Sequence, residues 1–313
     1  MTQRLLTFLR RWWPWMVGVA IIAIIAARLP VAAFRDAMSH GPHHWLAGLD
    51  LIVAVVLLGT DSVATWIGLV AVRMRRPFAD VAAVRGATFL LFLVNYALGQ
   101  GGFGYYLHRT GTPAQRALGA TLFLIGTNLA VLLLLTSVAW AVDGGGVPND
   151  ALWWTLTVGS AGFGAYLIVV AIAPRFLARR DWLAPLFDAG LGGHAVALLG
   201  RTPHVLMIVG SHWLAMRVWG FEVPASAALT VVPAIALAAA LPISPGGLGT
   251  TQAATVFFFS SYAVGATEDE RAAAVLAFSV VHFVYSVIAA VLVGLVCIPF
   301  ARRTGAIPSR TAT

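Results

Sequence analysis

Residues 242–252 read PISPGGLGTTQ and lie inside a run of 45 residues, Val223 to Thr267, that contains no charged side chain. A helix rises about 1.5 Å per residue, so an unbroken helix of this length would be about 68 Å long, twice the ~30 Å hydrocarbon core of a bilayer. The chain must therefore turn near the middle of the run. Two prolines and three glycines mark the turn, and interrupted backbone is tolerated in a membrane only where protein or a water-filled cavity covers it.

The composition of the whole chain indicates the same environment. Of 313 residues, 60% are hydrophobic and only 10% are charged, and the mean hydropathy is +0.87. Such a chain lacks the polar surface of a soluble domain, so we expect an all-α polytopic membrane protein with one integral-membrane domain over residues 1–313. The net charge of +8 is typical of cytoplasmic loops in a membrane protein and predicts no nucleic-acid partner. The single Cys297 excludes a disulfide framework and a cysteine metal site.

The apolar runs predict about eight crossings of the membrane. The first follows three arginines and a tryptophan cluster, which favours an uncleaved anchor over a cleaved signal because another span follows at once. The expected spans are Trp12–Ala27, Ala47–Val72, Ala117–Val142, Ala151–Pro174, Pro203–Gly220, Val223–Ile243, Thr250–Thr267 and Ala272–Phe300. The segment Arg175–Arg201, which mixes charged and apolar residues, is expected to lie at the cytoplasmic interface.

One further apolar segment, Gly86–Leu107, decides the topology. If it enters the membrane and returns to the same side, sixteen arginines, with Arg85 and Arg201 among them, share one face and three lie opposite. If it crosses, the split is eight against eleven. The positive-inside rule favours the first arrangement, with both termini cytoplasmic in a cell inner membrane. The part from Gly86 to Leu98 would be about 20 Å long as a helix, too short to span the core before the glycines of GQGGFG interrupt it. We therefore expect a re-entrant, glycine-broken helix pair.

Two similar glycine motifs occur in the two halves of the chain. QGGFG at 100–104 and PGGLG at 245–249 share the pattern of two glycines, one apolar residue and a third glycine. Paired interruptions of this kind are typical of transporters built from repeats, whose substrate site lies where the broken helices meet. The alternative is a packing surface, because glycine strings also let membrane helices approach closely.

The C-terminal third carries a resemblance to a known family. PISPGGLGTTQAA, the connection GATEDERAAAVLAF and a long final span are similar to the lysylphosphatidylglycerol synthase transmembrane family, also called flippase-like. The earlier stretches WIGLVAVRMRRPFADVAAVRG and GGFGYYLHRTGTPAQRALGA fit the same family, so the resemblance covers nearly the whole chain. It implies a multi-span protein that moves amino-acylated or other polar lipids between leaflets. The soluble aminoacyl-transferring domain of the bifunctional members is not found in these residues, so no synthase activity is implied.

Two positions depart from the family pattern. The family usually has glutamate where this chain has Gln252, often preceded by arginine where this chain has Thr251. Its first break usually carries a proline and a charged residue, where this chain has Gly99, Gln100 and Tyr105. The carboxylate that would pair with a cationic lipid is therefore missing from the second motif.

The predicted substrate site combines the glycine breaks with polar side chains near them. Arg109 and Arg217 are the expected partners of a lipid phosphate, because an arginine beside a half-helix N-terminus can bind one. The alternative for Arg109 is a loop arginine that only follows the positive-inside rule. The alternative for Arg217 is a side chain that extends to the external interface. The expected substrate-binding residues are Gln100, Gly101, Gly102, Gly104, Arg109, His212, Arg217, Ser244, Pro245, Gly246, Gly247, Gly249 and Gln252.

Buried ionisable residues add further expectations. Asp61 lies within a predicted span, so it is the candidate for proton coupling, against the alternative of a protonated aspartate bonded to a neighbouring helix. Asp50 is expected at the external interface and His282 in the core, bonded to a backbone carbonyl. The histidine cluster at 40–44 lacks a carboxylate or cysteine to complete a metal site, so no metal is expected.

These features predict a flippase-like transporter that moves a polar or lipid-linked head group between leaflets. The alternatives are a membrane-embedded transferase, or its accessory subunit, acting on a lipid-linked sugar or aminoacyl lipid, and a scaffold for a lipid-modifying enzyme encoded separately. No phosphate-loop lysine, HExxH or nucleophile elbow occurs, so the sequence favours a transporter over an enzyme. Membrane lipids are the expected partners and no cofactor is expected.

Overall fold

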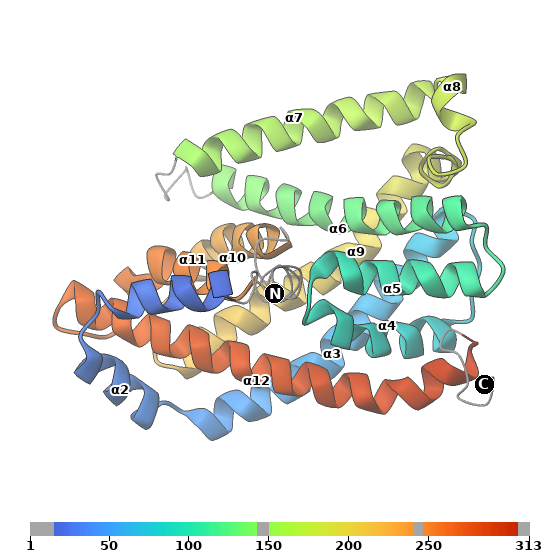
Figure 1. Ribbon diagram of the computed structural model, residues 1–313. Coiled ribbons are helices and arrows are strands. Elements are labelled where there is room, and N and C mark those ends of the chain that lie inside the picture. Colours follow the sequence, from blue (N-terminus) through green and yellow to red (C-terminus); the bar gives the residue numbers. More distant parts are fainter. Residues whose placement is uncertain (1–15, 143–149, 241–246, 306–313) are drawn as a thin grey trace, which may run out of the picture.

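The computed structural model describes residues 16–142, 150–240 and 247–305, and every regular element in these ranges is a helix (Figure 1). After a first helix, Met16–Ala26, the elements are α2 (Val31–His40), α3 (His43–Ala71), α4 (Phe78–Phe92), α5 (Tyr96–Arg109), α6 (Ala114–Val142), α7 (Asp150–Ile172), α8 (Arg175–Ala178), α9 (Ala184–Val218), α10 (Ala225–Ala240), α11 (Thr250–Phe259), the 3₁₀ turn η2 (Ser260–Tyr262) and α12 (Glu268–Arg303). The all-α fold class predicted from the sequence is confirmed.

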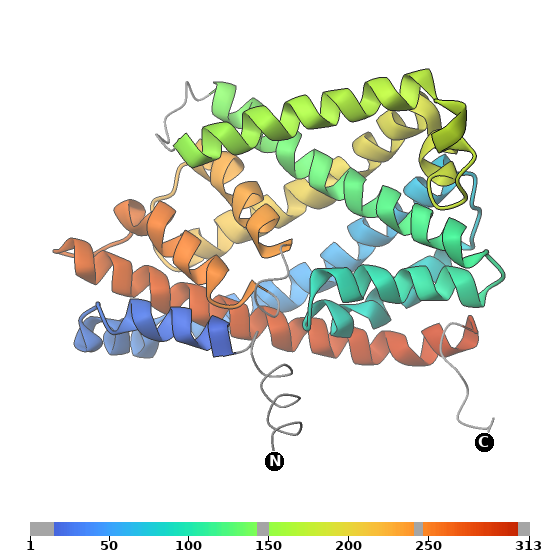
Figure 2. The same cartoon turned by 45° about the horizontal axis from the view of Figure 1, so that its top comes forward.

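The same order of helices occurs twice along the chain. A long helix, a hairpin of two short helices and a second long helix follow one another as α3, α4–α5 and α6, and again as α9, α10–α11 and α12. Figures 1 and 2 show the two hairpins in opposite halves of the molecule, with α12 running along both. This order is the one expected of a protein built from two repeats of opposite orientation.

The α4–α5 hairpin begins and ends at the same end of the bundle. Arg76, just before α4, donates from Nη2 to the Thr110 carbonyl at 3.2 Å and to Thr112 Oγ1 at 2.9 Å, which ties the entry of the hairpin to its exit. With 15 and 14 residues, its helices are about 22 Å and 21 Å long, shorter than the hydrocarbon core. The hairpin therefore has the geometry expected of a re-entrant pair.

The break in this hairpin lies before the glycine run. The chain leaves the helical conformation at Asn95, whose Oδ1 accepts from the Leu98 amide at 3.1 Å and caps α5. The prediction that GQGGFG interrupts the helix was wrong, because residues 99–104 are helical. A Cβ on Gly99 or Gly102 would overlap α4 side chains, and one on Gly104 would overlap Thr121 of α6. These glycines are a packing surface, the alternative considered for the motif.

The α10–α11 hairpin also returns to its starting end. The Glu222 amide, before α10, donates to the Tyr262 carbonyl, after α11, at 3.0 Å. The described part of its turn uses positive φ at Gly247 (76°) and Gly249 (84°), a conformation in which L side chains are strained. Gln252 Oε1 then accepts from the Gly249 amide at 2.6 Å and closes the first turn of α11. Ser244, Pro245 and Gly246 lie outside the described residues.

The long helix α9 corrects one boundary drawn from the sequence. Arg175–Arg201 was expected to lie at the interface, with a new span beginning at Pro203. Instead α9 continues through Pro203 and has its non-helical residue earlier, at Gly190 (φ 56°). Arg201 therefore lies at the midpoint of the helix, inside the bundle, and not at the membrane surface.

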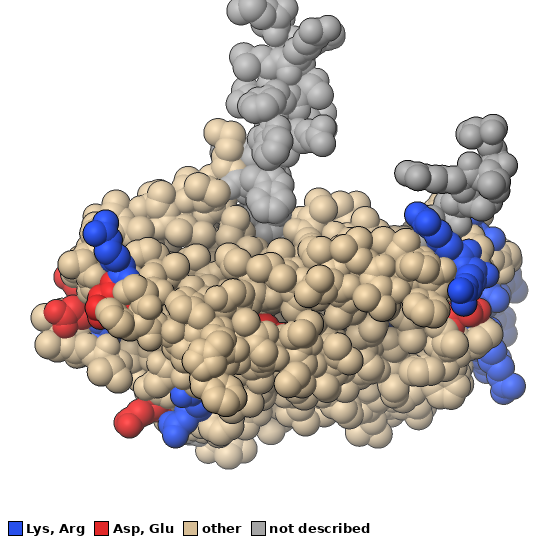
Figure 3. Space-filling model, turned by 90° about the horizontal axis from the view of Figure 1, so that it is seen from below, with Lys and Arg blue, Asp and Glu red and all other residues tan. Residues whose placement is uncertain are grey.

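Four helices of the described chain are long and apolar enough to cross a membrane, namely α3, α6, α12 and Leu152–Ile172 of α7. The number becomes five if Met16–Ala26 and Val31–His40, bent by 109°, form one span, so the expected count of about eight is not confirmed. Charged side chains gather at the two ends of the face in Figure 3, and the band between them is almost entirely uncharged. This distribution suits a bundle whose long axis crosses a bilayer.

Each hairpin has its own apolar core. One cluster joins α4 and α5 to α3 and α6 and contains Phe103, Tyr106 and Phe123; the other joins α10 and α11 to α9 and α12 and contains Phe221, Phe259 and Phe278. The buried charged side chains of the described residues, Asp50, Asp61, Arg85 and Arg201, are contributed by α3, α4 and α9.

Candidate functional site

A carboxylate paired with two arginines lies inside the bundle. Asp61 of α3 accepts from Arg85 Nε of α4 at 2.6 Å through Oδ2, and from Arg201 Nη1 of α9 at 2.5 Å through Oδ1. The three side chains are only 3–4% exposed. Each carboxylate oxygen thus has its own guanidinium, and α9 joins the consecutive helices α3 and α4 at this group. Isolated charges cannot be buried at low cost, so the pairing explains how all three are accommodated.

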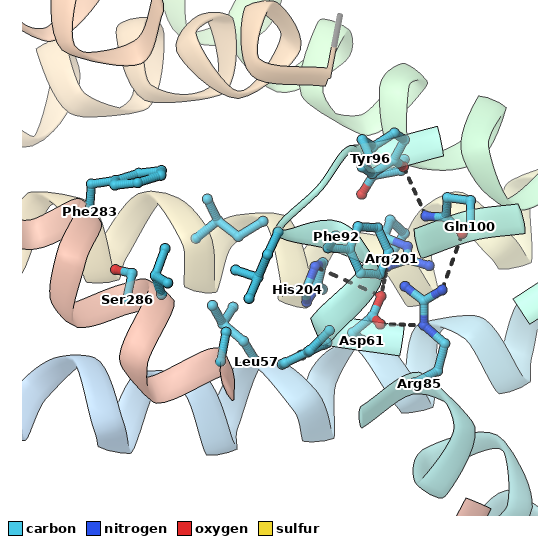
Figure 4. A pocket seen from close by; sticks show the side chains of 16 residues that line it. Leu57, Asp61, Arg85, Phe92, Tyr96, Gln100, Arg201, His204, Phe283 and Ser286 are labelled. Carbon is cyan, nitrogen blue, oxygen red and sulfur yellow. Dashed lines mark hydrogen bonds and ion pairs between the residues drawn. The ribbon is translucent and has the colours of Figure 1, made fainter. Parts of the chain in front are cut away.

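Further polar groups extend the cluster on two sides. Arg85 Nη1 donates to Gln100 Oε1 at 3.1 Å, and Gln100 Nε2 donates to the Tyr96 hydroxyl at 3.1 Å. On the other side His204 Nε2 lies 3.9 Å from Asp61 Oδ1 (Figure 4). The cluster is therefore a continuous polar network that runs from α5 across α4 and α3 to α9.

The network carries an unbalanced charge. One carboxylate and two guanidinium groups sum to +1, counted with a neutral His204. The guanidinium of Arg85 also lies 5.2 Å and 5.5 Å from the ring centroids of Phe92 and Phe103. Arg201 Nε is buried and has no hydrogen-bond partner among the described residues. A single anion would balance the charge.

The network forms part of the wall of a cavity of about 400 Å³. Figure 4 shows the charged and amide side chains at one side of this cavity, and apolar side chains with Ser286 at the other. The lining residues are Leu57, Asp61, Arg85, Phe89, Phe92, Leu93, Tyr96, Gln100, Asn128, Arg201, His204, Ile208, Phe283, Ser286, Val287 and Ala290. A site with a positive side and an apolar side can accommodate a molecule that joins an anionic group to hydrocarbon.

The structure brings few of the sequence-predicted residues together. Asp61 and Gln100 line the cavity. Arg109 and Arg217 are exposed at the ends of α5 and α9, outside the lining. The described glycines of both motifs lie outside the lining. Gly102 and Gly104 pack against helices, Gly101 is exposed, and Gly247 and Gly249, with Gln252, shape the start of α11. His212 lies beside His282, 5.1 Å between ring centroids, and not at the cavity.

The residues that sequence reasoning missed are the two arginines and their neighbour. Arg85 and Arg201 were counted with the cytoplasmic loop arginines, and His204 was not considered as part of a site. A usable signal was present for Arg201, because apolar residues continue on both sides of it in AVALLGRTPHVLMIVG. An arginine within such a run is better explained by a buried partner than by a loop.

Asp61 lies inside the predicted span, where it is paired with two arginines. The sequence offered a proton-coupling aspartate or a protonated one bonded to a neighbouring helix, and the structure surrounds it with two cations. This arrangement makes Asp61 the counter-ion of the arginines. Its role is to hold both guanidinium groups at the cavity wall.

Fold and site together define a polytopic helical membrane protein with a charged cavity inside its bundle. The model of a protein family described as the lysylphosphatidylglycerol synthase TM region matches residues 15–290. The chain therefore belongs to this family. A search of curated proteins returns no match for the chain.

Proposed function

We propose that this protein is a lipid translocator that takes the head group of an anionic or lipid-linked substrate into the cavity between α3, α4, α9 and α12 and moves it between leaflets. The observation that carries the proposal is the net charge of +1 on the buried Asp61–Arg85–Arg201 cluster. A lipid phosphate diester carries one negative charge and presents oxygens that guanidinium groups bind well. Binding would neutralise the cluster.

The apolar side of the cavity supports a lipid over a free anion. Leu57 and Phe283 line the cavity, and large apolar side chains such as Ile52, Val284 and Ile288 are exposed on the outer faces of α3 and α12. In a bilayer those faces would contact acyl chains. A substrate with a polar head and a hydrocarbon tail could then keep its tail outside while the head enters.

We further propose that the chain lies in the cell inner membrane with both termini cytoplasmic. The sixteen arginines assigned to that side become fourteen once the buried Arg85 and Arg201 are removed, and three remain opposite. The positive-inside rule still favours this orientation. It places the open end of the α4–α5 hairpin at the cytoplasm and that of α10–α11 at the external side.

The test is a leaflet-accessibility assay with purified protein in vesicles. Fluorescent phosphatidylglycerol and fluorescent phosphatidylcholine serve as probes, and a membrane-impermeant quencher reports movement. We expect wild type to move the anionic lipid, and Arg201→Gln to slow it at least tenfold. Arg116→Gln is the matched control, because Arg116 is partly exposed and pairs with Asp188 outside the cavity. Equal rates in wild type and Arg201→Gln would refute the proposal.

The same preparation distinguishes the alternative of a transferase or its accessory subunit. A transferase would change the mass of the labelled lipid when a lipid-linked sugar or aminoacyl lipid is supplied. A translocator would change only its leaflet. Recovery of a modified probe with no change of leaflet would favour the enzyme.

A further inference from the structure

A second buried group of ionisable side chains lies on the same helix as Asp61. Asp50 of α3 is 3% exposed, and both of its carboxylate oxygens lie 3.1 Å from His282 Nδ1 of α12. Ser286 Oγ donates to Asp50 Oδ1 at 3.3 Å. The expectation that His282 bonds to a backbone carbonyl was therefore wrong, and Asp50, expected near the external interface, is buried against α12. The two residues form a pair in the interior.

This pair differs from Asp61 in the cations available to it. No arginine lies within ion-pair distance of Asp50 among the described residues, so a protonated His282 is the cation within reach. Phe278 stacks on the His282 ring at 5.4 Å, and His212 of α9 meets the ring edge-on at 5.1 Å. His212 Nε2 is buried and has no hydrogen-bond partner in the described chain. Counted with an ionised Asp50 and neutral histidines, the group has a charge of −1, which one added proton cancels.

No other charged side chain forms an ion pair with Asp50 or His282 among the described residues. Toward the outer end of α3, His43 Nδ1 lies 3.2 Å from the Tyr285 hydroxyl of α12. On α2, which also packs against α12, the Asp36–His40 pair has side chains 73% and 78% exposed. The interior group thus consists of Asp50, His282 and His212, with His43 and Tyr285 between it and the end of the bundle.

The pair is linked to the cavity in two ways. Ser286 both binds Asp50 and lines the cavity wall (Figure 4). Asp50 and Asp61 are 11 residues apart, three helical turns, so they share one face of α3 at a separation of about 16 Å. At an effective dielectric constant of about 20, a unit charge at this distance changes the affinity for a second charge by about fivefold.

We propose that Asp50 and His282 form a proton-binding site that couples proton uptake from the His43 end of α3 to the binding of an anion in the cavity. A proton taken from solution cancels the negative charge of the pair and so favours an anion beside Arg201 by about fivefold. Coupling of this kind is reciprocal, so the bound anion favours the proton equally. A proton gradient that is acidic at the His43 end would then load the substrate from that side. The inference rests on the proposed function, to which it adds the energy source.

The experiment uses full-length protein in vesicles with fluorescent phosphatidylglycerol, with and without an imposed pH gradient. We expect the gradient to speed the movement of the probe about fivefold in wild type. Asp50→Asn should move the probe at equal pH but lose the response to the gradient. Asp36→Asn, which alters the exposed aspartate–histidine pair, should respond as wild type does. An Asp50→Asn protein with a full response would overturn the proposal.

A second variant and a second assay cover the cases in which Asp50→Asn does not fold or wild type moves no probe. If Asp50→Asn fails to fold, His282→Gln removes the side chain that takes up the proton, and an unchanged gradient response in it would overturn the proposal. If wild type moves no probe, the proposed function fails. The proton site is then tested separately, by counting the protons that the protein takes up in lipid nanodiscs between neutral and mildly acidic pH. We expect Asp50→Asn to take up one proton fewer per chain than Asp36→Asn; equal counts would refute the site.

Discussion

Replacing Asp61 by asparagine should destabilise the protein more than replacing either arginine partner. In wild type the cluster has a net charge of +1, and both guanidinium groups depend on one carboxylate. Asp61→Asn raises the net charge to +2 and leaves two cations buried without a counter-ion. Removing one partner from a buried ion pair costs about 3–5 kcal/mol, because the remaining charge is uncompensated.

The arginine variants provide the internal comparison. Arg201→Gln leaves Asp61 paired with Arg85 at a net charge of zero. The main loss is the charge-assisted hydrogen bond to Asp61, about 1.5–3 kcal/mol, together with the weaker 3.3 Å bond from Arg201 Nη2 to Thr65 Oγ1. The double variant Asp61→Asn with Arg201→Gln returns the charge to +1. We expect it to be more stable than Asp61→Asn alone, although it contains one substitution more.

The assay is thermal unfolding of the purified protein in detergent, followed by tryptophan fluorescence. A loss of this size lowers Tm by several degrees. The reasoning would be refuted if Asp61→Asn unfolded at or above the temperature of Arg201→Gln, or if the double variant were less stable than both single ones. Either result would mean that the carboxylate does not hold the two arginines in the interior.

Three further predictions concern the hairpins. Gly99→Ala should cost about 1–3 kcal/mol because its Cβ would lie within 2.6 Å of ring atoms of Phe92 on α4, whereas Gly101→Ala, with open space around it, should be neutral or slightly stabilising by the same unfolding assay. Gln252→Ala should cost about 1 kcal/mol because the Gly249 amide loses its acceptor, and Gln252→Glu should retain most of that stability. Single cysteines placed at Arg109 and Arg217 in a cysteine-free background should react with an impermeant maleimide from opposite sides of the membrane. Labelling of both from one side would contradict the arrangement in which the two hairpins open to opposite sides.

Much of the fold follows from patterns that are local in the sequence. The uncharged run from Val223 to Thr267 is too long for one span and was expected to turn, and in the structure it forms the α10–α11 hairpin. The shortness of Gly86–Leu98 and the distribution of arginines pointed to a re-entrant pair, and α4–α5 has that geometry. The position of its break was missed because Asn95, a weak signal in the sequence, caps the second helix while the glycines serve packing.

The site could not be predicted in the same way, because its residues meet only after folding. Asp61 was recognised from its place in an apolar run, but its partners are 24 and 140 residues away. Arg201 was assigned to the surface because Pro203 looked like the start of a helix, and neighbouring helices in a membrane allow a helix to continue through proline. Composition identifies a buried charge, whereas tertiary packing selects its counter-ion.

The most direct test of the central claim is photo-crosslinking of a lipid head group in the cavity. A photoreactive amino acid at Phe283, which lines the cavity, is compared with one at its neighbour Val284, which is 46% exposed on the outer face of α12. We predict that labelled phosphatidylglycerol crosslinks at 283 and that unlabelled phosphatidylglycerol, but not phosphatidylcholine, displaces it. Arg201→Gln should abolish this crosslink, whereas the crosslink at 284 should persist. Crosslinking at 283 that is insensitive to Arg201→Gln, or absent while 284 is labelled, would contradict the claim that the arginines bind the head group.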